Sequence, residues 1–226
     1  MWVGMVKKVY HDLIKYVSPS LSPMAACGRV LKEINPNCKV VFIGPCIAKK
    51  AEAKDKDIKK YIDFVLTFQE LKEIFEAFNI NPEKETDESS LEYASRGGRL
   101  YARLGGVSTA IAEAVERLYP EKFPLFSAFS CSGVKECRET LDKAIKGDLN
   151  HNFIEGMGCI GGCVGGPKAI IQKTLGETYA NETADSSKIK VAVDSHCMIE
   201  VLKKININSI EDFKHEEKTK IFHREL

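Results

Sequence analysis

Amphipathic segments and short apolar runs alternate along this 226-residue chain. Apolar residues recur at helical spacing and predict helices over residues 1–16, 24–34, 69–78, 107–118, 133–146 and 195–205. Apolar runs bounded by turn residues predict strands over residues 39–43, 61–67, 124–130 and 152–157. Thr67 is placed to cap the helix at 69–78, with Glu70 in its first turn. Because strands alternate with helices, we predict an α/β fold of mainly parallel sheet flanked by helices.

Polar stretches interrupt this alternation. Residues 79–90 are rich in acidic side chains and contain Pro82, which is typical of a linker or mobile loop. We therefore expect one domain over residues 1–226 with two possible lobes, 1–90 and 91–226. Residues 167–174 are predicted to be helical, 176–188 to be polar and mobile, and 190–193 to form a short strand or extended link.

Composition and charge argue against two classes of partner. Hydrophobic residues make up 44% of the chain and charged residues 29%, which is ordinary for a globular protein. The 33 basic and 32 acidic residues leave a net charge of +1, which gives no sign of nucleic-acid binding. No apolar run approaches the roughly 18 residues of a membrane helix, and the N-terminus is too charged for a signal peptide. We therefore predict a cytoplasmic protein with no nucleic-acid or membrane partner.

Eight cysteines are many for a cytoplasmic protein, and because disulfides are disfavoured there they indicate packing, catalysis or metal binding. Cys159 and Cys163 lie in the glycine-rich segment 155–167, after a predicted strand. If the segment turns into a helix after Cys159, their spacing places both sulfurs on one face. The glycines would let backbone N–H groups approach a bulky inorganic group and hydrogen-bond its sulfurs. The alternative is a tight glycine turn with two buried thiols.

Cys46 is a third candidate ligand, because it follows the predicted strand 39–43. Open α/β sheets place their ligands at the carboxyl ends of strands. Lys49, three residues later, is able to hold a positive charge over an anionic group at that strand end. The alternatives are a buried thiol at Cys46 and solvated side chains at Lys49 and Glu52, which lie in a charged run.

The remaining cysteines suggest other roles. Cys131 and Cys137 flank a predicted strand-to-helix turn and are candidates for a ligand pair, a redox pair or two core thiols, of which we favour core thiols or support of a neighbouring site. Their separation is not the CxxC of thioredoxin-like chemistry, which argues against a thiol-based redox enzyme. Cys27 and Cys38 are interpreted as packing residues, and Cys197 as no ligand, since His196 beside it would point elsewhere on a helix.

Two cysteine motifs together resemble a known family. The first of them here, Pro45-Cys46-Ile-Ala-Lys49-Lys50-Ala-Glu52, resembles the second cysteine motif in the catalytic domain of the iron-only hydrogenases. The segment 155–167, Glu-Gly-Met-Gly-Cys-Ile-Gly-Gly-Cys-Val-Gly-Gly-Pro, resembles the third motif of that domain, which lies in the large subunit. Weaker landmarks are Ser22-Pro-Met24 and Leu104-Gly-Gly-Val107, so the resemblance covers essentially the whole chain.

The resemblance implies a two-lobed fold with a cluster site between the lobes. Cys46, Cys159 and Cys163 would be three of the four thiolates that hold the 4Fe-4S cubane of the H-cluster, and Cys163 would bridge to the di-iron subsite. Lys49 would hydrogen-bond a cyanide of that subsite, Met157 would pack beside it, and Glu52 would belong to the proton route. The family reaction is the reversible reduction of protons to dihydrogen. Electrons would arrive from a redox partner or from additional iron–sulfur domains of the same polypeptide.

The chain also departs from the family pattern. The first cysteine motif, expected just before Ser22, is absent, and with it the fourth cubane ligand and a proton-relaying cysteine. We therefore expect a fragment of a larger protein that does not evolve hydrogen by itself, with an empty and loosely ordered loop after Met157. The third motif is shortened at Gly165-Gly166-Pro167, which resembles the divergent, sensory branch of the family. The alternative is a plain 4Fe-4S electron-transfer or structural protein without a di-iron subsite.

Overall fold

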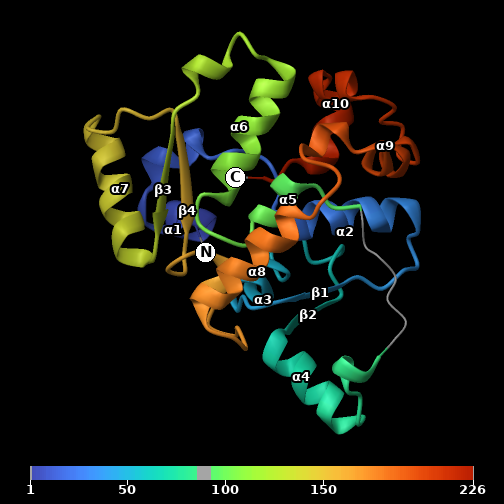
Figure 1. Ribbon diagram of the computed structural model, residues 1–226. Coiled ribbons are helices and arrows are strands. Elements are labelled where there is room, and N and C mark those ends of the chain that lie inside the picture. Colours follow the sequence, from blue (N-terminus) through green and yellow to red (C-terminus); the bar gives the residue numbers. More distant parts are fainter. Residues whose placement is uncertain (1, 86–92, 226) are drawn as a thin grey trace. The chain divides into compact units, whose positions relative to one another are not determined.

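The computed structural model describes residues 2–85 and 93–225 and shows an α/β fold with parallel strand pairing, as predicted (Figure 1). Part of the predicted linker 79–90 lies outside the described residues; before that gap, Pro82–Lys84 forms a 3-10 turn. No helix in the described ranges has the length and apolar character needed to cross a membrane. The helices are α1 Trp2–Val9, α2 Pro23–Ile34, α3 Ala48–Glu52, α4 Phe68–Ala77, α5 Arg96–Leu100, α6 Gly106–Leu118, α7 Val134–Lys146, α8 Lys173–Asp185, α9 His196–Lys203 and α10 Glu216–Thr219, and the strands are β1 Val41–Gly44, β2 Phe64–Thr67, β3 Ala128–Ser132 and β4 Phe153–Met157.

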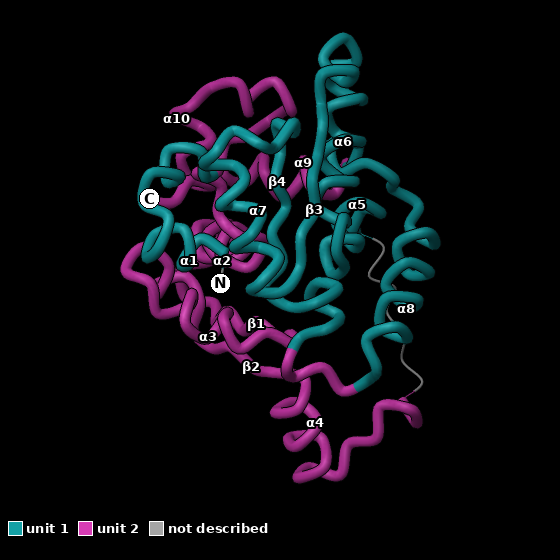
Figure 2. The backbone as a smooth tube through the Cα atoms, turned by 90° about the vertical axis from the view of Figure 1, so that its left-hand side faces the viewer, with its two compact units in different colours: residues 1–17, 92–166, 171–195 teal, residues 18–91, 167–170, 196–226 magenta. Residues whose placement is uncertain are grey.

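The chain divides into two compact units that interleave along the sequence (Figure 2). Unit 1 comprises residues 1–17, 92–166 and 171–195, and unit 2 comprises 18–91, 167–170 and 196–226. The expected lobes differ from the units at the chain ends, because the first 17 residues pack within unit 1 and the last 31 within unit 2.

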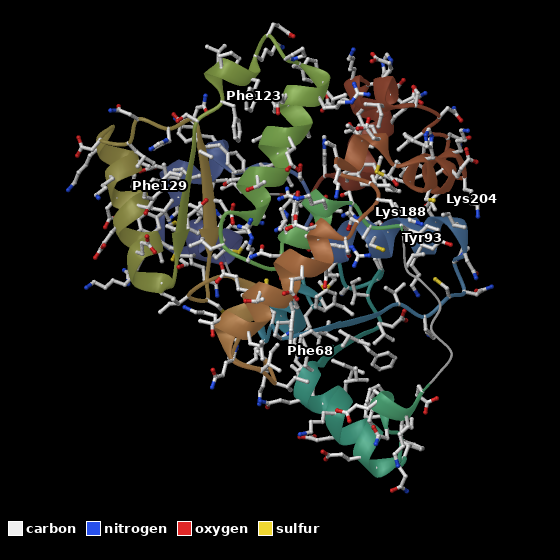
Figure 3. All side chains as sticks on the ribbon, viewed as in Figure 1. Phe68, Tyr93, Phe123, Phe129, Lys188 and Lys204 are labelled. Atoms are coloured by element: carbon white, nitrogen blue, oxygen red, sulfur yellow. The ribbon has the colours of Figure 1, made fainter. Side chains whose placement is uncertain are left out.

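Unit 2 is built on a parallel β1–β2 pair, with Val41 opposite Phe64 and Gly44 opposite Thr67. Both strands are shorter than predicted. Figure 3 shows Phe68, the first residue of α4, directly after β2. Thr67 caps α4 as predicted, since its Oγ1 accepts from the Glu70 N–H and the Glu70 carboxylate accepts from the Thr67 N–H.

Helix α2 carries the core of unit 2. Pro23 occupies its first turn, where a missing N–H costs nothing, and the Ser22 Oγ accepts from the Ala25 N–H. Met24 and Ala25, on one face of α2, pack in a cluster with Leu21, Val40, Ile58 and Ile62. Farther along, Val30 packs with residues near the C-terminus, including Leu202 and Ile207. The segment around Phe222 pairs with the residues just before α2, since the Leu21 N–H donates to the Phe222 carbonyl at 2.7 Å.

Unit 1 is built on the parallel β3–β4 pair, which runs from Ala128 opposite Phe153 to Ser132 opposite Met157. Helices α6 and α7 lie on opposite sides of this pair in Figure 1. Phe129 of β3, labelled in Figure 3, lies against the ring of His151 with centroids 5.5 Å apart. Helix α1 packs its Val6 and Tyr10 against Leu141 of α7.

Three predictions for residues 167–195 need correction. The helix predicted at 167–174 forms only at its last two residues, where α8 begins at Lys173. Before it, residues 167 and 168 form a turn in which the Lys168 N–H donates to the Pro45 carbonyl. The segment predicted to be mobile forms most of α8, in which Gly176 and Ala184 are buried. Polar side chains of α8 hold the helix in place, because Asp185 forms an ion pair with Arg96 and Asn181 accepts a hydrogen bond from Arg103. The extended link predicted at 190–193 holds only at its start, because Val191 is extended whereas residues 192–194 form a 3-10 turn.

Candidate functional site

Cys46 lies at the carboxyl end of β1, as predicted. The strand ends at Gly44, Pro45 follows, and α3 begins two residues after the cysteine. The Cys46 side chain is partly exposed, so the buried-thiol alternative does not hold in this structure. The fold therefore presents this sulfur at the strand end, where α/β folds hold ligands.

Lys49 and Glu52 form a largely buried ion pair on α3. The Lys49 Nζ lies 2.6 Å from a Glu52 carboxylate oxygen, and the two side chains are 21% and 15% exposed. Arg224, only 9% exposed, approaches the other oxygen of Glu52 to 3.3 Å. Its backbone N–H donates to the Pro19 carbonyl at 2.7 Å, which fixes this end of the chain beside α3. Glu52 is thus not the solvated surface acid of the alternative reading.

This environment keeps Glu52 ionised. Burial pushes the pKa of the Glu52 carboxyl upward, but the charge of Lys49, hydrogen bonds from Lys49 and Ser22, and the charge of Arg224 outweigh that effect. The pKa therefore lies below its ordinary value. Sequence reasoning missed Arg224, because a residue so far along the chain gives no local signal of where it packs.

The third motif leaves β4 at Met157 and enters a turn that holds both of its cysteines. Cys159 and Cys163 are partly exposed. The predicted helix after Cys159 does not form: Gly161 and Gly162 adopt φ values of 85° and 94°, and a 3-10 turn covers only Cys163–Gly165. Positive φ favours glycine and interrupts a right-handed helix, so the i, i+4 helical argument does not describe this pair.

The cysteine loop, defined here as residues 158–166, is fastened to the segment before α6. The Leu104 N–H donates to the Gly161 carbonyl at 2.9 Å, and the Val164 N–H donates to the Ala102 carbonyl at 2.9 Å. A Cβ on Gly162 would lie 2.7 Å from the Leu104 nitrogen, so glycine permits this close approach. The glycines thus have a packing role that the sequence did not suggest, and the expectation of a loosely ordered loop is wrong.

Glu155 is a second residue that sequence reasoning missed. Its carboxylate is 4% exposed and accepts from the backbone N–H groups of Gly105 and Ser108, at 2.9 and 2.7 Å. The Ser108 hydroxyl donates to it as well, at 2.7 Å. A glutamate in the middle of an apolar strand was the available signal, since such a charge is buried only when donors surround it.

The end of the third motif meets the second motif inside unit 2. Lys168, the residue after Pro167, donates its N–H to the Pro45 carbonyl at 3.2 Å, and its Nζ lies 2.8 Å from the Gln69 side-chain oxygen. Pro45 directly precedes Cys46. Within the described ranges, no group of three or more histidine, cysteine, aspartate or glutamate side chains is gathered to hold a metal ion.

Cys131 and Cys137 are core thiols, the reading that we favoured. Both are fully buried, with sulfurs 3.6 Å apart. The Cys137 thiol donates to the Met157 carbonyl at 3.4 Å and the Cys131 thiol to the Glu155 carbonyl at 3.5 Å. Burial raises the pKa of Cys131, and burial together with Cys131 raises the pKa of Cys137 to about 12. Neutral, inaccessible thiols do not suit a thiol-based redox enzyme.

Thiol labelling under native conditions should separate these cysteines. Cys197 is exposed and should react rapidly with an aromatic disulfide reagent at pH 8, whereas Cys131 and Cys137 should react only as fast as the protein opens. Peptide mapping after timed quenching measures the rates. Labelling of Cys137 as fast as Cys197 would contradict the buried assignment. Cys27, interpreted as a packing residue, is exposed in the structure and gives a second accessible reference.

Comparisons with known proteins identify the family. The family described as "Iron only hydrogenase large subunit, C-terminal domain" matches residues 1–167, which include both cysteine motifs. The chain is 26% identical over 234 aligned positions to iron hydrogenase 1 of Clostridium pasteurianum, covering 85% of this chain and 40% of that protein. It is 26% identical to the large subunit of the periplasmic iron hydrogenase of Nitratidesulfovibrio vulgaris, covering 77% of this chain and 51% of that protein. The chain thus spans about half or less of the length of these relatives.

Solved structures agree on the fold. A variant of the hydrogenase HydA1 from Chlamydomonas reinhardtii superimposes with a TM-score of 0.73 at 20% identity, covering 99% of this chain and 73% of the other.

A shorter sequence match is to the cytosolic Fe-S cluster assembly factor NAR1 of Kluyveromyces lactis. It is 34% identical over 69 residues and covers 30% of this chain and 15% of that protein. Since the family match extends over residues 1–167 of 226, the chain belongs to the family formed by the C-terminal domains of iron-only hydrogenase large subunits.

Proposed function

We propose that this chain is the cluster-binding part of an iron-only hydrogenase-like iron–sulfur protein. In this proposal Cys46, Cys159 and Cys163 are thiolate ligands of a 4Fe-4S cluster. Cysteine thiolates are the ligands that such clusters take, and all three side chains are partly exposed. Cys131 and Cys137, by contrast, are enclosed in the core. The donor chemistry of the three motif cysteines therefore fits the group.

One observation carries the proposal, a backbone hydrogen bond within unit 2. It ties Pro45, the residue before Cys46, to Lys168, the residue after the third motif. Two motifs far apart in sequence need such a link if their sulfurs are to serve one cluster. Fixed backbone at both motifs also lowers the conformational entropy that ligand binding would otherwise have to remove.

Lys49 and Glu52 are proposed to act together. A 4Fe-4S cluster with thiolate ligands, and any di-iron subsite with cyanide ligands, carries negative charge and supplies the electron-transfer chemistry. The Lys49 ammonium would offer hydrogen bonds to that negative group, while the ionised Glu52 holds the ammonium in place. Since two cations hold Glu52 in its charged form, anchoring Lys49 is the role that its contacts favour over carrying protons. Met157 would pack beside the subsite from the end of β4.

The whole protein's reaction is proposed at family level. It would interconvert protons and dihydrogen, or sense hydrogen or redox state, and the shortened end of the third motif favours the sensor. Electrons would pass to a redox partner or to further iron–sulfur domains of the same polypeptide. A cytoplasmic location is proposed from the eight cysteines, because no disulfide joins any two of them in the described part of the chain.

Anaerobic reconstitution followed by iron and sulfide quantitation tests the ligand assignment. We expect about four irons per chain, most of them lost in Cys159→Ser. The matched control is Cys197→Ser, an exposed cysteine outside the family match that should leave the iron content unchanged. Equal iron content in all three proteins, or no iron in any, would overturn the proposal.

Infrared spectroscopy then distinguishes the hydrogenase-like protein from a plain cluster protein. Chain matured with the di-iron subsite should show carbonyl and cyanide stretching bands, and Lys49→Met should shift the cyanide bands. A protein that holds iron and sulfide but never shows these bands after maturation would be a plain 4Fe-4S protein.

A further inference from the structure

The buried carboxylate of Glu155 organises the start of α6. It accepts from two backbone N–H groups of the first turn and from the Ser108 hydroxyl, and the Ser130 hydroxyl lies 3.5 Å away. A negative charge is favourable at a helix N-terminus, where N–H groups lack intrahelical acceptors. Gly105, the N-cap residue, has φ of 77° and no side chain with which to cap the helix. Glu155 therefore supplies from β4 the cap that α6 lacks locally.

The capped turn is continuous with the segment that holds the cysteine loop. Gly105, whose N–H binds Glu155, directly follows Leu104, whose N–H donates to the Gly161 carbonyl. Two residues before Leu104, the Ala102 carbonyl accepts from the Val164 N–H. A single short stretch, residues 102–105, is thus held by Glu155 on one side and holds the cysteine loop on the other.

The same glutamate also precedes the loop along the chain. Glu155 is followed by Gly156 and Met157, the last residues of β4, and then by the loop with Cys159. The cysteine loop is attached to β4 through the chain itself and to residues 102–105 through hydrogen bonds. The Glu155 side chain connects β4 to the start of α6 through hydrogen bonds of 2.7–2.9 Å to Gly105 and Ser108.

We propose that Glu155 is a positioning residue for the cluster-ligand loop: its carboxylate locks residues 102–105 onto β4 and thereby sets the backbone that carries Cys159 and Cys163. This inference rests on the proposed function for its consequence in cluster binding. The claim that Glu155 positions the backbone of the cysteine loop applies whether or not a cluster is bound.

Glu155→Gln is the sharpest variant, since glutamine keeps the length but turns an NH2 group toward N–H and O–H donors. Either Gly105 or Ser108 then loses its acceptor, and the charge that both N–H groups bind is removed, so the hold on residues 102–105 weakens. In the cluster-free chain, we expect amide exchange at Leu104 and Val164 to accelerate roughly tenfold, as measured by hydrogen–deuterium exchange. In the reconstituted chain, we expect roughly ten- to hundredfold faster loss of iron to a chelator.

A merely local cap would give a different pattern. Exchange would then rise at Gly105 and Ser108, whose N–H groups lose their acceptor, while Leu104, Val164 and the rate of iron loss stay as in the parent. That result would overturn the inference. Amide exchange at Leu104 and Val164 is measured in the cluster-free chain. If the parent chain fails to bind iron, the proposed function is therefore contradicted, while this test of Glu155 remains valid.

Two further variants complete the design. Glu136→Gln is the matched control, because Glu136 also accepts a backbone N–H, from Ser132 at 2.8 Å, but on a different helix. It should leave exchange at Leu104 and Val164 unchanged. If Glu155→Gln does not fold, Glu155→Asp keeps the charge but draws the carboxylate back by one methylene from the Gly105 and Ser108 N–H groups. It should give a smaller acceleration at the same two amides, and no change in Glu155→Asp would then contradict the inference.

Discussion

Gly106→Ala is expected to destabilise the protein by at least about 3 kcal/mol, near the upper end of what overpacking costs. A Cβ at this position would overlap the carbonyl oxygen and carbon of Leu100, the last residue of α5. Leu100 is itself 1% exposed, so the backbone there has no free direction in which to move. Helices α5 and α6 can join at this spacing only because residue 106 has no side chain.

Urea unfolding followed by circular dichroism measures this effect, and a thermal scan should show a midpoint lower by roughly 6–12 °C. The matched control is Gly4→Ala in α1, where a Cβ would meet nothing within 4 Å. There alanine should stabilise by about 0.5–1 kcal/mol, because glycine is a poor helix former. If the unfolding free energy of Gly106→Ala lies within about 1 kcal/mol of that of the parent, the close approach of α5 and α6 is contradicted.

Glu52→Gln should be the second large effect, a loss of about 2–4 kcal/mol. Removing this carboxylate leaves Lys49 and Arg224, both largely buried, without their shared counter-charge. The control is Glu200→Gln in the exposed pair of Glu200 with Lys203, which has the same i, i+3 spacing. An exposed pair is worth at most about 1 kcal/mol. Equal losses in the two variants would contradict the burial of the Glu52 pair.

The same pair predicts a pH dependence. The pKa of Glu52 is lowered in the folded protein, so its ion pairs stabilise the fold fully above the ordinary value of 4.5. That stabilisation is lost as the pH falls through the folded pKa. The difference in unfolding free energy between the parent and Glu52→Gln should therefore be constant from pH 7 to about 5 and shrink below 4.5. A difference that grows toward acid would contradict the sign.

Local signals predicted the parts of the fold that depend on neighbours in sequence. Thr67 and Glu70 form their capping box where the pattern placed it, and α7 covers nearly the predicted range. Cys46 lies at a strand end because an apolar run stopped at Gly44-Pro45. These features need only a few residues of context, so the sequence pattern contains them.

Features that depend on distant partners escaped the pattern. Helix α8 is polar and looked mobile, yet its Asn181 and Asp185 are anchored by Arg103 and Arg96. Glu155 was visible only as a charge in an apolar strand, and its role required the position of α6. In each case the missing information was which segment packs opposite, which neither periodicity nor spacing records.

The interleaving of the two units has a consequence for biosynthesis. The apolar face of α2 around Val30 is covered by residues from α9 onward, and the Leu21 N–H donates a hydrogen bond to the Phe222 carbonyl. At a translation rate of about 5–20 residues per second, that cover is synthesised roughly 5–27 s after residue 91. Throughout that interval the nascent α2 would present bare apolar surface to solvent or to a chaperone. Unit 2 can therefore complete its fold only after residues 196–226 have left the ribosome, long after its first strands were made.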